Sequence, residues 1–281
     1  MATEGAPRET EPILSVNRLT VRYGTGCSDC ENGIGLQKNR CPKCGTIWAL
    51  RDAAFSLYQG EVLGVVGESG SGKSTMMKCI CFDESPTLGE YTVHTGGGNA
   101  FQLSRQSQKQ FRNERMGMVY QNPMLGLKMD YSVTSNIAEN LIASNCKNVS
   151  HLRARVTELL EIVEISPFRM KEKPKYFSGG MQQRVQIAKA IANNPQILLL
   201  DEVTTGLDLS VQAKVLDVIK KIIREFNVAV ILVSHDLAVI KMLADRTVVM
   251  LDGEIIERGL TDQVMEDPQH PYTQQLVHSL L

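Results

Sequence analysis

The sequence has no excess of charge of either sign and no long hydrophobic run. Its 281 residues carry 30 Lys and Arg against 31 Asp and Glu, so no broad basic surface is available for nucleic acid or anionic lipid. The longest apolar runs, such as VAVILV at 228–233, are far shorter than a bilayer crossing requires. The opening MATEGAPRETEP contains neither an apolar core nor a basic leader, so we expect a polar, frayed tail over residues 1–12 and no secretory signal. These features predict a cytoplasmic chain that neither binds nucleic acid nor inserts directly into a membrane.

The strongest local pattern is VLGVVGESGSGKST, at residues 62–75. A run rich in β-branched residues leads into G-x-x-x-x-G-K-S and then into the helix-compatible TMMKCI, which predicts a strand, a phosphate loop and a helix. A glycine-rich turn that matches by chance is the weaker interpretation, because it would not need a strand before it and a helix after it. Glycines let backbone N–H groups wrap closely around phosphate oxygens. Lys73 should meet the β- and γ-phosphates, and the Ser74 hydroxyl should bind Mg²⁺. The predicted nucleotide contacts of this loop are Gly67, Ser69, Gly70, Ser71, Gly72, Lys73, Ser74 and Thr75.

Two further apolar strands end in polar residues that suit hydrolysis. ILLLDE ends in Asp201 and Glu202, and VAVILVSHD places His235 just beyond its strand. At the carboxyl ends of parallel strands beside a phosphate loop, Asp201 can bind Mg²⁺ while Glu202 orients or deprotonates the attacking water. His235 can hydrogen-bond the γ-phosphate and sense its loss. Taken singly, each feature would more simply be a strand exit or a surface histidine, so their weight comes from occurring together.

A second potential anion site precedes an amphipathic helix. In FSGGMQQRVQIAKAIANNP, the turn formed by Ser178, Gly179 and Gly180 begins a helix whose N-terminal N–H groups can hold an anion. The first loop already accounts for the phosphates of one nucleotide. This second site therefore makes most sense if it serves a nucleotide bound to another copy, which predicts a homodimer.

These motifs resemble those of the ATP-binding-cassette (ABC) ATPases, and the resemblance runs from about Ile13 to the end. It implies ATP and Mg²⁺ as ligands, and two cassettes packed head to tail. Each ATP would lie between the phosphate loop of one copy and the Ser-Gly-Gly turn of the other. Met181 and Val203 depart from the commonest family pattern, but neither replaces a phosphate or metal ligand. The family pattern also assigns Gln121 in VYQNP to Mg²⁺ and the helical lobe, Asp208 in TTGLD to the D-loop, and Tyr23 in LTVRYG to stacking on adenine.

The predicted fold class is α/β, a P-loop nucleoside triphosphatase with three additions: an antiparallel β subdomain, a helical subdomain and a small zinc-ribbon-like insertion. Residues 13–23 and 49–67 alternate like antiparallel strands, and 130–180 are rich in helical spacing. The predicted divisions are a flexible tail at 1–12, the ATPase domain at 13–260 and a C-terminal helical extension at 261–281. Within the ATPase domain, the insertion covers 25–46 and the helical subdomain about 130–180.

The insertion contains CSDCENGIGLQKNRCPKC, in which Cys27, Cys30, Cys41 and Cys44 form two Cys-x-x-Cys pairs. Cytoplasmic thiols stay reduced, so the pairs indicate a metal more than disulfides. Their type and spacing match a structural four-thiolate zinc site, whose binding energy can substitute for apolar burial. An iron–sulfur cluster and a metal-free loop are the alternatives. Because the insertion adjoins Tyr23, our hypothesis is that it either docks a partner or props the adenine-stacking aromatic.

Two branches of the family share the motifs near the end of the chain. DPQHPYTQQLV and SGGMQQR are similar to the oligopeptide and nickel importer ATPases, and also to the ATP-binding subunit of bacterial carbon–phosphorus lyase. GLTDQVMEDPQHPYTQQLV and QNPMLGLKM are more similar to the second, although the four-cysteine insertion departs from its usual pattern. The lyase resemblance implies a soluble partner complex with a radical S-adenosylmethionine subunit, and the importer resemblance implies a membrane permease. A scaffold that binds ATP without hydrolysing it is disfavoured, because Glu202 and His235 are both present.

Overall fold

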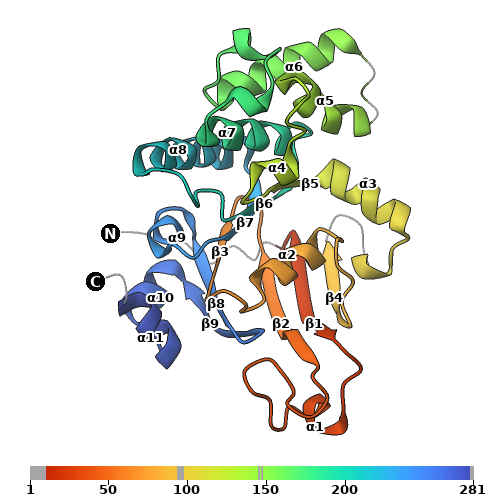
Figure 1. Ribbon diagram of the computed structural model, residues 1–281, viewed down its shortest axis with the longest axis vertical. Helices are drawn as coiled ribbons and strands as arrows, with labels where there is room; N and C mark the ends of the chain where they lie inside the picture. Colours follow the sequence, from red (N-terminus) through yellow and green to blue (C-terminus); the bar gives the residue numbers. More distant parts are fainter. Residues whose placement is uncertain (1–10, 94–97, 145, 147, 279–281) are drawn as a thin grey trace, which may run out of the picture.

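The computed structural model describes residues 11–93, 98–144, 146 and 148–278, so most of the predicted tail and the last three residues lie outside the described part. Helices and strands are interspersed along the chain (Figure 1). In sequence they are β1 (Leu14–Tyr23), α1 (Ser28–Glu31), β2 (Ile47–Leu57), β3 (Val62–Val66), α2 (Lys73–Ile80), β4 (Leu88–Val93), η1 (Ala100–Gln102), α3 (Arg105–Arg115), β5 (Met116–Val119), α4 (Pro123–Gly126), α5 (Val133–Ala143), α6 (Val149–Ile162), η2 (Pro167–Arg169), η3 (Pro174–Tyr176), α7 (Gly179–Ala190), β6 (Ile197–Asp201), α8 (Leu209–Phe226), β7 (Ala229–Val233), α9 (Leu237–Leu243), β8 (Arg246–Leu251), β9 (Glu254–Leu260), α10 (Thr261–Glu266) and α11 (Pro271–His278).

A six-stranded sheet in the order β5-β6-β7-β3-β8-β9 forms the centre of the molecule. Its strands are parallel except for β9, which pairs antiparallel with β8. Successive side chains of a strand face opposite ways, so β6 contributes to a hydrophobic core on each face. Leu198 and Leu200 pack into the core shared with α7 and α8, whereas Ile197 and Leu199 pack into the core shared with α2 and the smaller sheet. Burial on both faces explains why these strands are uniformly apolar.

The smaller sheet has the order β2-β1-β4 and is antiparallel, as predicted for residues 13–23 and the first part of 49–67. The prediction was wrong for the end of that second stretch. Val62–Val66 is β3, a parallel strand in the middle of the large sheet, and all five of its residues are buried. Its continuous apolar character reflects this two-sided burial rather than an antiparallel edge.

The helices α5, α6 and α7 form a lobe at one end of the molecule, above the large sheet in Figure 1. The predicted spacing in HLRARVTELLEIVEI is realised in α6, where Val156, Leu159 and Leu160 are fully buried. These side chains belong to the core shared with α8 and β6, so the lobe packs directly against the nucleotide-binding half. Across the described ranges, no helix combines the length and the apolar character needed to traverse a bilayer.

The four-cysteine segment lies between the paired strands β1 and β2 and projects from the far end of the smaller sheet (Figure 1). Of residues 24–46, only Cys30, Cys41 and Thr46 are buried. Cys30 and Cys41 form a separate small cluster with Trp48, which is not joined to the two large cores. The segment therefore has almost no apolar core of its own.

Candidate ATP site

The loop between β3 and α2 has the backbone shape that a phosphate-binding loop requires. Gly67 and Gly72 have φ angles of 151° and 104°. A Cβ atom at Gly67 would lie 2.2 Å from the carbonyl oxygen of Met250, and one at Gly72 would lie 2.4 Å from that of Ala49. Both positions therefore exclude any side chain, because the loop is pressed between the β2 and β8 backbones.

Lys73 is folded back into this loop. Its ammonium donates to the carbonyl oxygens of Gly67, at 2.7 Å, and Glu68, at 2.8 Å, and lies 3.4 Å from Ser71 Oγ. Burial lowers the pKa of Lys73, and the nearby carboxylates of Glu202 and Asp201 oppose that shift. A cation held at the centre of a loop of backbone N–H groups is suited to bind the terminal phosphates of a nucleotide.

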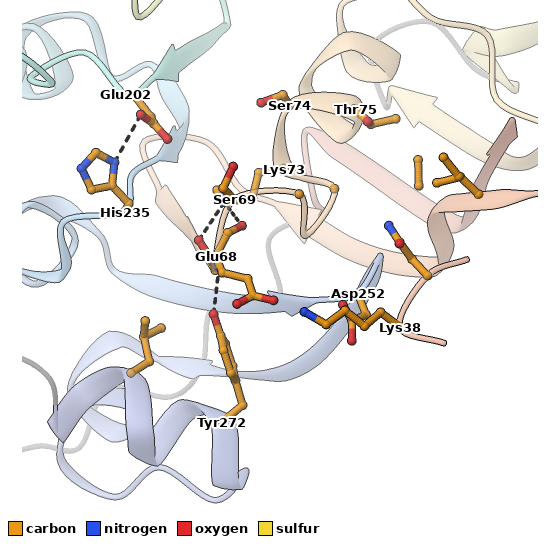
Figure 2. A pocket seen from close by; sticks show the side chains of 17 residues that line it. Lys38, Glu68, Ser69, Lys73, Ser74, Thr75, Glu202, His235, Asp252 and Tyr272 are labelled. Atoms are coloured by element: carbon orange, nitrogen blue, oxygen red, sulfur yellow. Dashed lines mark hydrogen bonds and ion pairs between the residues drawn. The ribbon is translucent and has the colours of Figure 1, made fainter. Parts of the chain in front are cut away.

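A pocket of about 780 Å³ opens in front of the loop. Figure 2 shows Lys73, Ser74 and Thr75 on one side of it, with Glu202 and His235 across from them. The size and the lining suit a nucleotide. Its full lining is Lys38, Asn39, Ile47, Ala49, Gly67, Glu68, Ser69, Gly70, Gly72, Lys73, Ser74, Thr75, Glu202, His235, Asp252, Tyr272 and Leu276.

Three side chains converge on one oxygen of Glu202. Its Oε2 accepts hydrogen bonds from Gln121 Nε2, at 2.8 Å, and Thr205 Oγ1, at 3.3 Å, and lies 3.2 Å from His235 Nδ1 (Figure 2 shows the last contact). Glu202 itself adopts a φ of 46° just after β6, and its N–H donates to the carbonyl of Val233 in β7. The structure thus brings the predicted residues Gln121, Glu202 and His235, from three separate segments, together at the carboxyl edge of the sheet.

Asp201, Ser74 and Gln121 supply the oxygen atoms predicted to hold Mg²⁺. Burial raises the pKa of the Asp201 carboxyl, and repulsion from Glu202 adds to the shift while Lys73 and Lys78 oppose it. A divalent cation would relieve this repulsion between adjacent carboxylates, and hydroxyl, amide and carboxylate oxygens are the ligands that Mg²⁺ prefers. The donor types therefore suit the ion, and of the three residues only Ser74 lines the pocket.

The turn at Ser178–Gly180 does not line this pocket, and neither does Asp208. Ser178 caps α7 by accepting from the Met181 N–H, and Asp208 caps α8 by accepting from the Val211 N–H. Gly180 has a packing role as well, because a Cβ there would lie 2.0 Å from a methyl group of Val211. Both helix N-termini are thus formed, yet they lie outside the pocket of their own chain.

Tyr23 also lies outside the lining, but it borders it. Its Cα is paired with that of Ile47, which does line the pocket. The residue is 46% exposed, and its hydroxyl donates to Glu84 at 3.3 Å. Partial burial and the charge of Glu84 raise the pKa of Tyr23. An exposed aromatic next to the pocket edge is available for stacking on a base.

The four cysteines predicted to bind a metal lie together, with their sulfur atoms all within 4.8 Å of one another. Cys27 precedes the short helix α1, and its backbone N–H donates to Cys30 Sγ at 3.2 Å. In the second pair, the Gly45 N–H donates to the Cys41 carbonyl, and Cys44 Sγ lies 3.2 Å from Thr46 Oγ1. The remaining cysteines lie elsewhere, with Cys79 and Cys81 buried at the end of α2.

Several pocket residues were missed from the sequence. Lys38 and Asn39 come from the insertion, Asp252 from the β8–β9 turn, and Tyr272 from α11. The hydroxyl of Tyr272 accepts from the N–H of Glu68 at 2.8 Å (Figure 2). Sequence motifs contain Lys38, Asn39 and Tyr272 but did not indicate that they line the pocket, because they reach it through contacts between separate segments.

Two glutamines of α7 were also missed, and they tie the helical lobe to the segment that carries Gln121. Gln186 accepts from the Tyr120 N–H at 2.8 Å and donates to the Tyr120 carbonyl at 3.0 Å, and Gln183 donates to the same carbonyl at 3.2 Å. Both side chains are buried, so the bonds are shielded from water. The helix that starts at the Ser-Gly-Gly turn is thus coupled to the residue that contacts Glu202.

The parallel sheet, the phosphate loop and the paired carboxylates define a P-loop nucleoside triphosphatase. The family model described as ABC transporter matches residues 50–205, more than half of the sequence. The chain belongs to this family, and it is an ATP-hydrolysing ABC ATPase, for which ATP and Mg²⁺ are the expected ligands. The predicted fold class, including a four-cysteine cluster, is confirmed.

Comparison with individual proteins supports the same family. The chain is 41% identical to the phosphonates utilization ATP-binding protein PhnK of Escherichia coli (strain K12), over 96% of this chain and 98% of that protein. It is 37% identical to the oligopeptide transport ATP-binding protein OppD of Bacillus subtilis (strain 168), over 84% of this chain and 67% of that protein. The dimeric post-hydrolysis structure of the ATP-binding cassette MJ0796 bound to ADP and Pi superposes with a TM-score of 0.74 at 28% identity, covering 88% and 98% of the two chains.

Proposed function

We propose that this ATPase acts in the cytoplasm as a head-to-tail homodimer that drives conformational change in a carbon–phosphorus lyase complex of phosphonate catabolism. The similarity to PhnK, which extends over nearly the full length of both chains, supports this partner. The similarity to OppD leaves about a third of that protein uncovered.

The arrangement of α7 supports the dimer. Ser178 and Gly179 are exposed and lie outside the pocket of their own chain. Helix N-termini attract anions, so this one is available to a nucleotide held by the phosphate loop of a second copy. Asp208 is exposed at the start of the neighbouring helix and would face the same interface.

The segment after Gln121 supports coupling to a partner, and it is the observation that carries the proposed motor role. Gln121 bonds Glu202, and the short helix α4 follows at once. Met124 and Leu125 on α4 are 67% and 72% exposed, which places an apolar pair at the surface next to a residue that touches the hydrolytic carboxylate. A partner that covers this pair would be moved when Gln121 changes its contacts.

The cysteine geometry supports zinc over an iron–sulfur cluster. The sulfur–sulfur distances Cys27–Cys30, Cys27–Cys41 and Cys30–Cys44 are each 3.7 Å. A tetrahedral ion with Zn–S bonds of about 2.3 Å would separate its sulfur atoms by about 3.8 Å. A multi-iron cluster binds its thiolates through different iron atoms and would hold them farther apart. The metal would fix the fold of the insertion and take no part in hydrolysis.

The partner can be identified by capture from the native host grown on a phosphonate as sole phosphorus source. Tagged Glu202→Gln protein with ATP should hold the closed dimer and retain its partner, whereas Lys73→Ala protein, which cannot hold the phosphates, serves as the control. Mass spectrometry should then find soluble partners, including a radical-type enzyme subunit, enriched with the first variant. Equal recovery of these proteins with both variants would contradict an ATP-driven role.

The second candidate function is the motor of an oligopeptide, dipeptide or nickel importer, favoured by the similarity to OppD of Bacillus subtilis at 37% identity. The same capture experiment separates the two. Enrichment of a polytopic permease with the Glu202→Gln protein, without lyase subunits, would establish the importer role and refute the lyase role.

A further inference from the structure

One turn of the insertion reaches the edge of the ATP pocket. Lys38 and Asn39 line the pocket beside Ile47 and the phosphate loop, although both residues lie between the two cysteine pairs. Figure 2 shows the Lys38 side chain next to Asp252, extending toward Glu68. The four-cysteine segment is therefore not only a neighbour of the ATP site but supplies part of its wall.

The backbone of this turn is well defined. Gln37 and Arg40 exchange two backbone hydrogen bonds, of 2.9 and 3.0 Å, around the turn. The Asn39 carbonyl accepts from the Trp48 N–H at 2.7 Å, which attaches the turn to the start of β2. Lys38 has a φ of 54°, a left-handed conformation that a lysine seldom adopts, and such conformations concentrate at functional sites.

The ammonium group of Lys38 is available to bind a ligand. In the described part of the chain its side chain takes part in no ion pair and no hydrogen bond, unlike Lys43 of the same segment, which pairs with Asp29. The other charged side chains that line the pocket are the cation Lys73 and the carboxylates Glu68, Glu202 and Asp252. A second ammonium on this wall would offset those carboxylates and attract the oligophosphate of a nucleotide.

The turn is attached both to β2 and to the cysteine cluster. Residues 31–40 are all at least partly exposed, so apolar burial contributes little to holding Lys38 in place. Besides its hydrogen bond to Trp48, the turn is joined directly to Cys41, whose sulfur lies 3.7 Å from that of Cys27. In a segment with so small a core, metal binding supplies the folding energy.

We propose that Lys38 is a nucleotide-binding residue whose ammonium contacts the oligophosphate of ATP, and that metal bound to the four cysteines sets ATP affinity by holding Lys38 in the pocket. The second part rests on the proposed metal site, and neither part depends on the identity of the partner complex.

The first test compares Lys38→Gln with Arg40→Gln by titration calorimetry on the metal-loaded protein, using ATP and adenosine. Arg40 carries the same charge in the same turn, but it does not line the pocket. Lys38→Gln should weaken ATP binding about tenfold, as loss of one charged hydrogen bond implies, and leave adenosine binding unchanged. Arg40→Gln should change neither, and Lys38→Arg should restore most of the ATP affinity. Unchanged ATP affinity in Lys38→Gln, or equal losses for ATP and adenosine, would overturn the assignment of Lys38.

The second test is a double-mutant cycle with Cys41→Ser/Cys44→Ser, in which metal content is measured on every sample. The cysteine variant should lose the metal and weaken ATP binding by a factor similar to Lys38→Gln, and adding Lys38→Gln to it should cause no further loss. Unsubstituted protein treated with a chelator should behave like the cysteine variant. This control separates loss of the metal from misfolding caused by the serine substitutions. Additive effects would refute control of Lys38 by the metal. Purified protein without metal would refute the metal site while leaving the first test of Lys38 intact.

Discussion

The phosphate loop and the Lys38–Asn39 turn face the same pocket, but the chain holds them in place by different means. The loop follows β3, whose residues are all buried between two large cores, and its glycines press against the β2 and β8 backbones. The turn belongs to a segment with three buried residues, two of them cysteines. Hydrophobic burial thus fixes the phosphate loop, whereas we propose that metal bound to the thiols holds the turn that carries Lys38. Such an arrangement allows one wall to be altered without unfolding the other.

The largest effect should come from removing the hydrolytic carboxylate. Glu202→Gln should lower ATP turnover by at least about 100-fold, because the neutral amide cannot accept a proton from the attacking water. ATP binding should persist, since the role predicted for Glu202 is in the chemical step and the phosphate loop is untouched. The measurement is steady-state phosphate release together with ATP affinity. Glu266→Gln, an exposed change of the same type, is the control, and near-normal turnover in Glu202→Gln would remove Glu202 from the reaction.

The next largest effect should come from weakening the core beneath the phosphate loop. Leu199 in β6 is fully buried in the core shared with α2, so Leu199→Ala should lower the free energy of unfolding by about 2–5 kcal/mol. Ile34 in the insertion is 63% exposed, and Ile34→Ala should change stability by less than about 0.5 kcal/mol. Urea unfolding of both variants measures the difference. A larger loss of stability in Ile34→Ala than in Leu199→Ala would contradict the proposal that hydrophobic burial stabilises the phosphate loop and not the insertion.

Removing the metal should unfold the four-cysteine insertion and leave the large sheet folded. Cys41→Ser/Cys44→Ser should release the metal and increase hydrogen exchange across residues 25–46, while β6 and β7 keep their protection, because the insertion does not share their cores. Hydrogen-exchange mass spectrometry and elemental analysis check both points. Cys146→Ser, which removes a thiol outside the cluster, should retain the metal. Equal loss of protection in the strands and the insertion would show that the two regions fold as one unit.

The two walls also differed in how well the sequence predicted them. The strand, loop and helix around Lys73 could be predicted because each depends on neighbouring residues: a buried apolar run, obligatory glycines and a helical stretch. The four clustered cysteines were visible for the same reason, since each Cys-x-x-Cys pair is local. Lys38, Asp252 and Tyr272 could not be found this way, because their placement depends on long-range pairing. One such link is the bond from the Arg51 N–H to the Gly253 carbonyl, which brings β2 next to the β8–β9 turn.

The smallest effect should come from removing the hydrogen bond between Tyr272 and the phosphate loop. Tyr272 of α11 accepts a hydrogen bond from the Glu68 N–H, and Tyr272→Phe would remove this bond while keeping the ring that lines the pocket. A net hydrogen-bond contribution of about 0.5–1 kcal/mol predicts a loss of ATP affinity of no more than about fivefold, with the rate of hydrolysis at saturation unchanged. Tyr176→Phe, at an exposed position outside the pocket, is the matched control. A larger loss, approaching that expected for Lys38→Gln, would mean that the loop depends on α11 for its shape. Hydrophobic burial around β3 would then be insufficient to fix the phosphate-binding wall by itself.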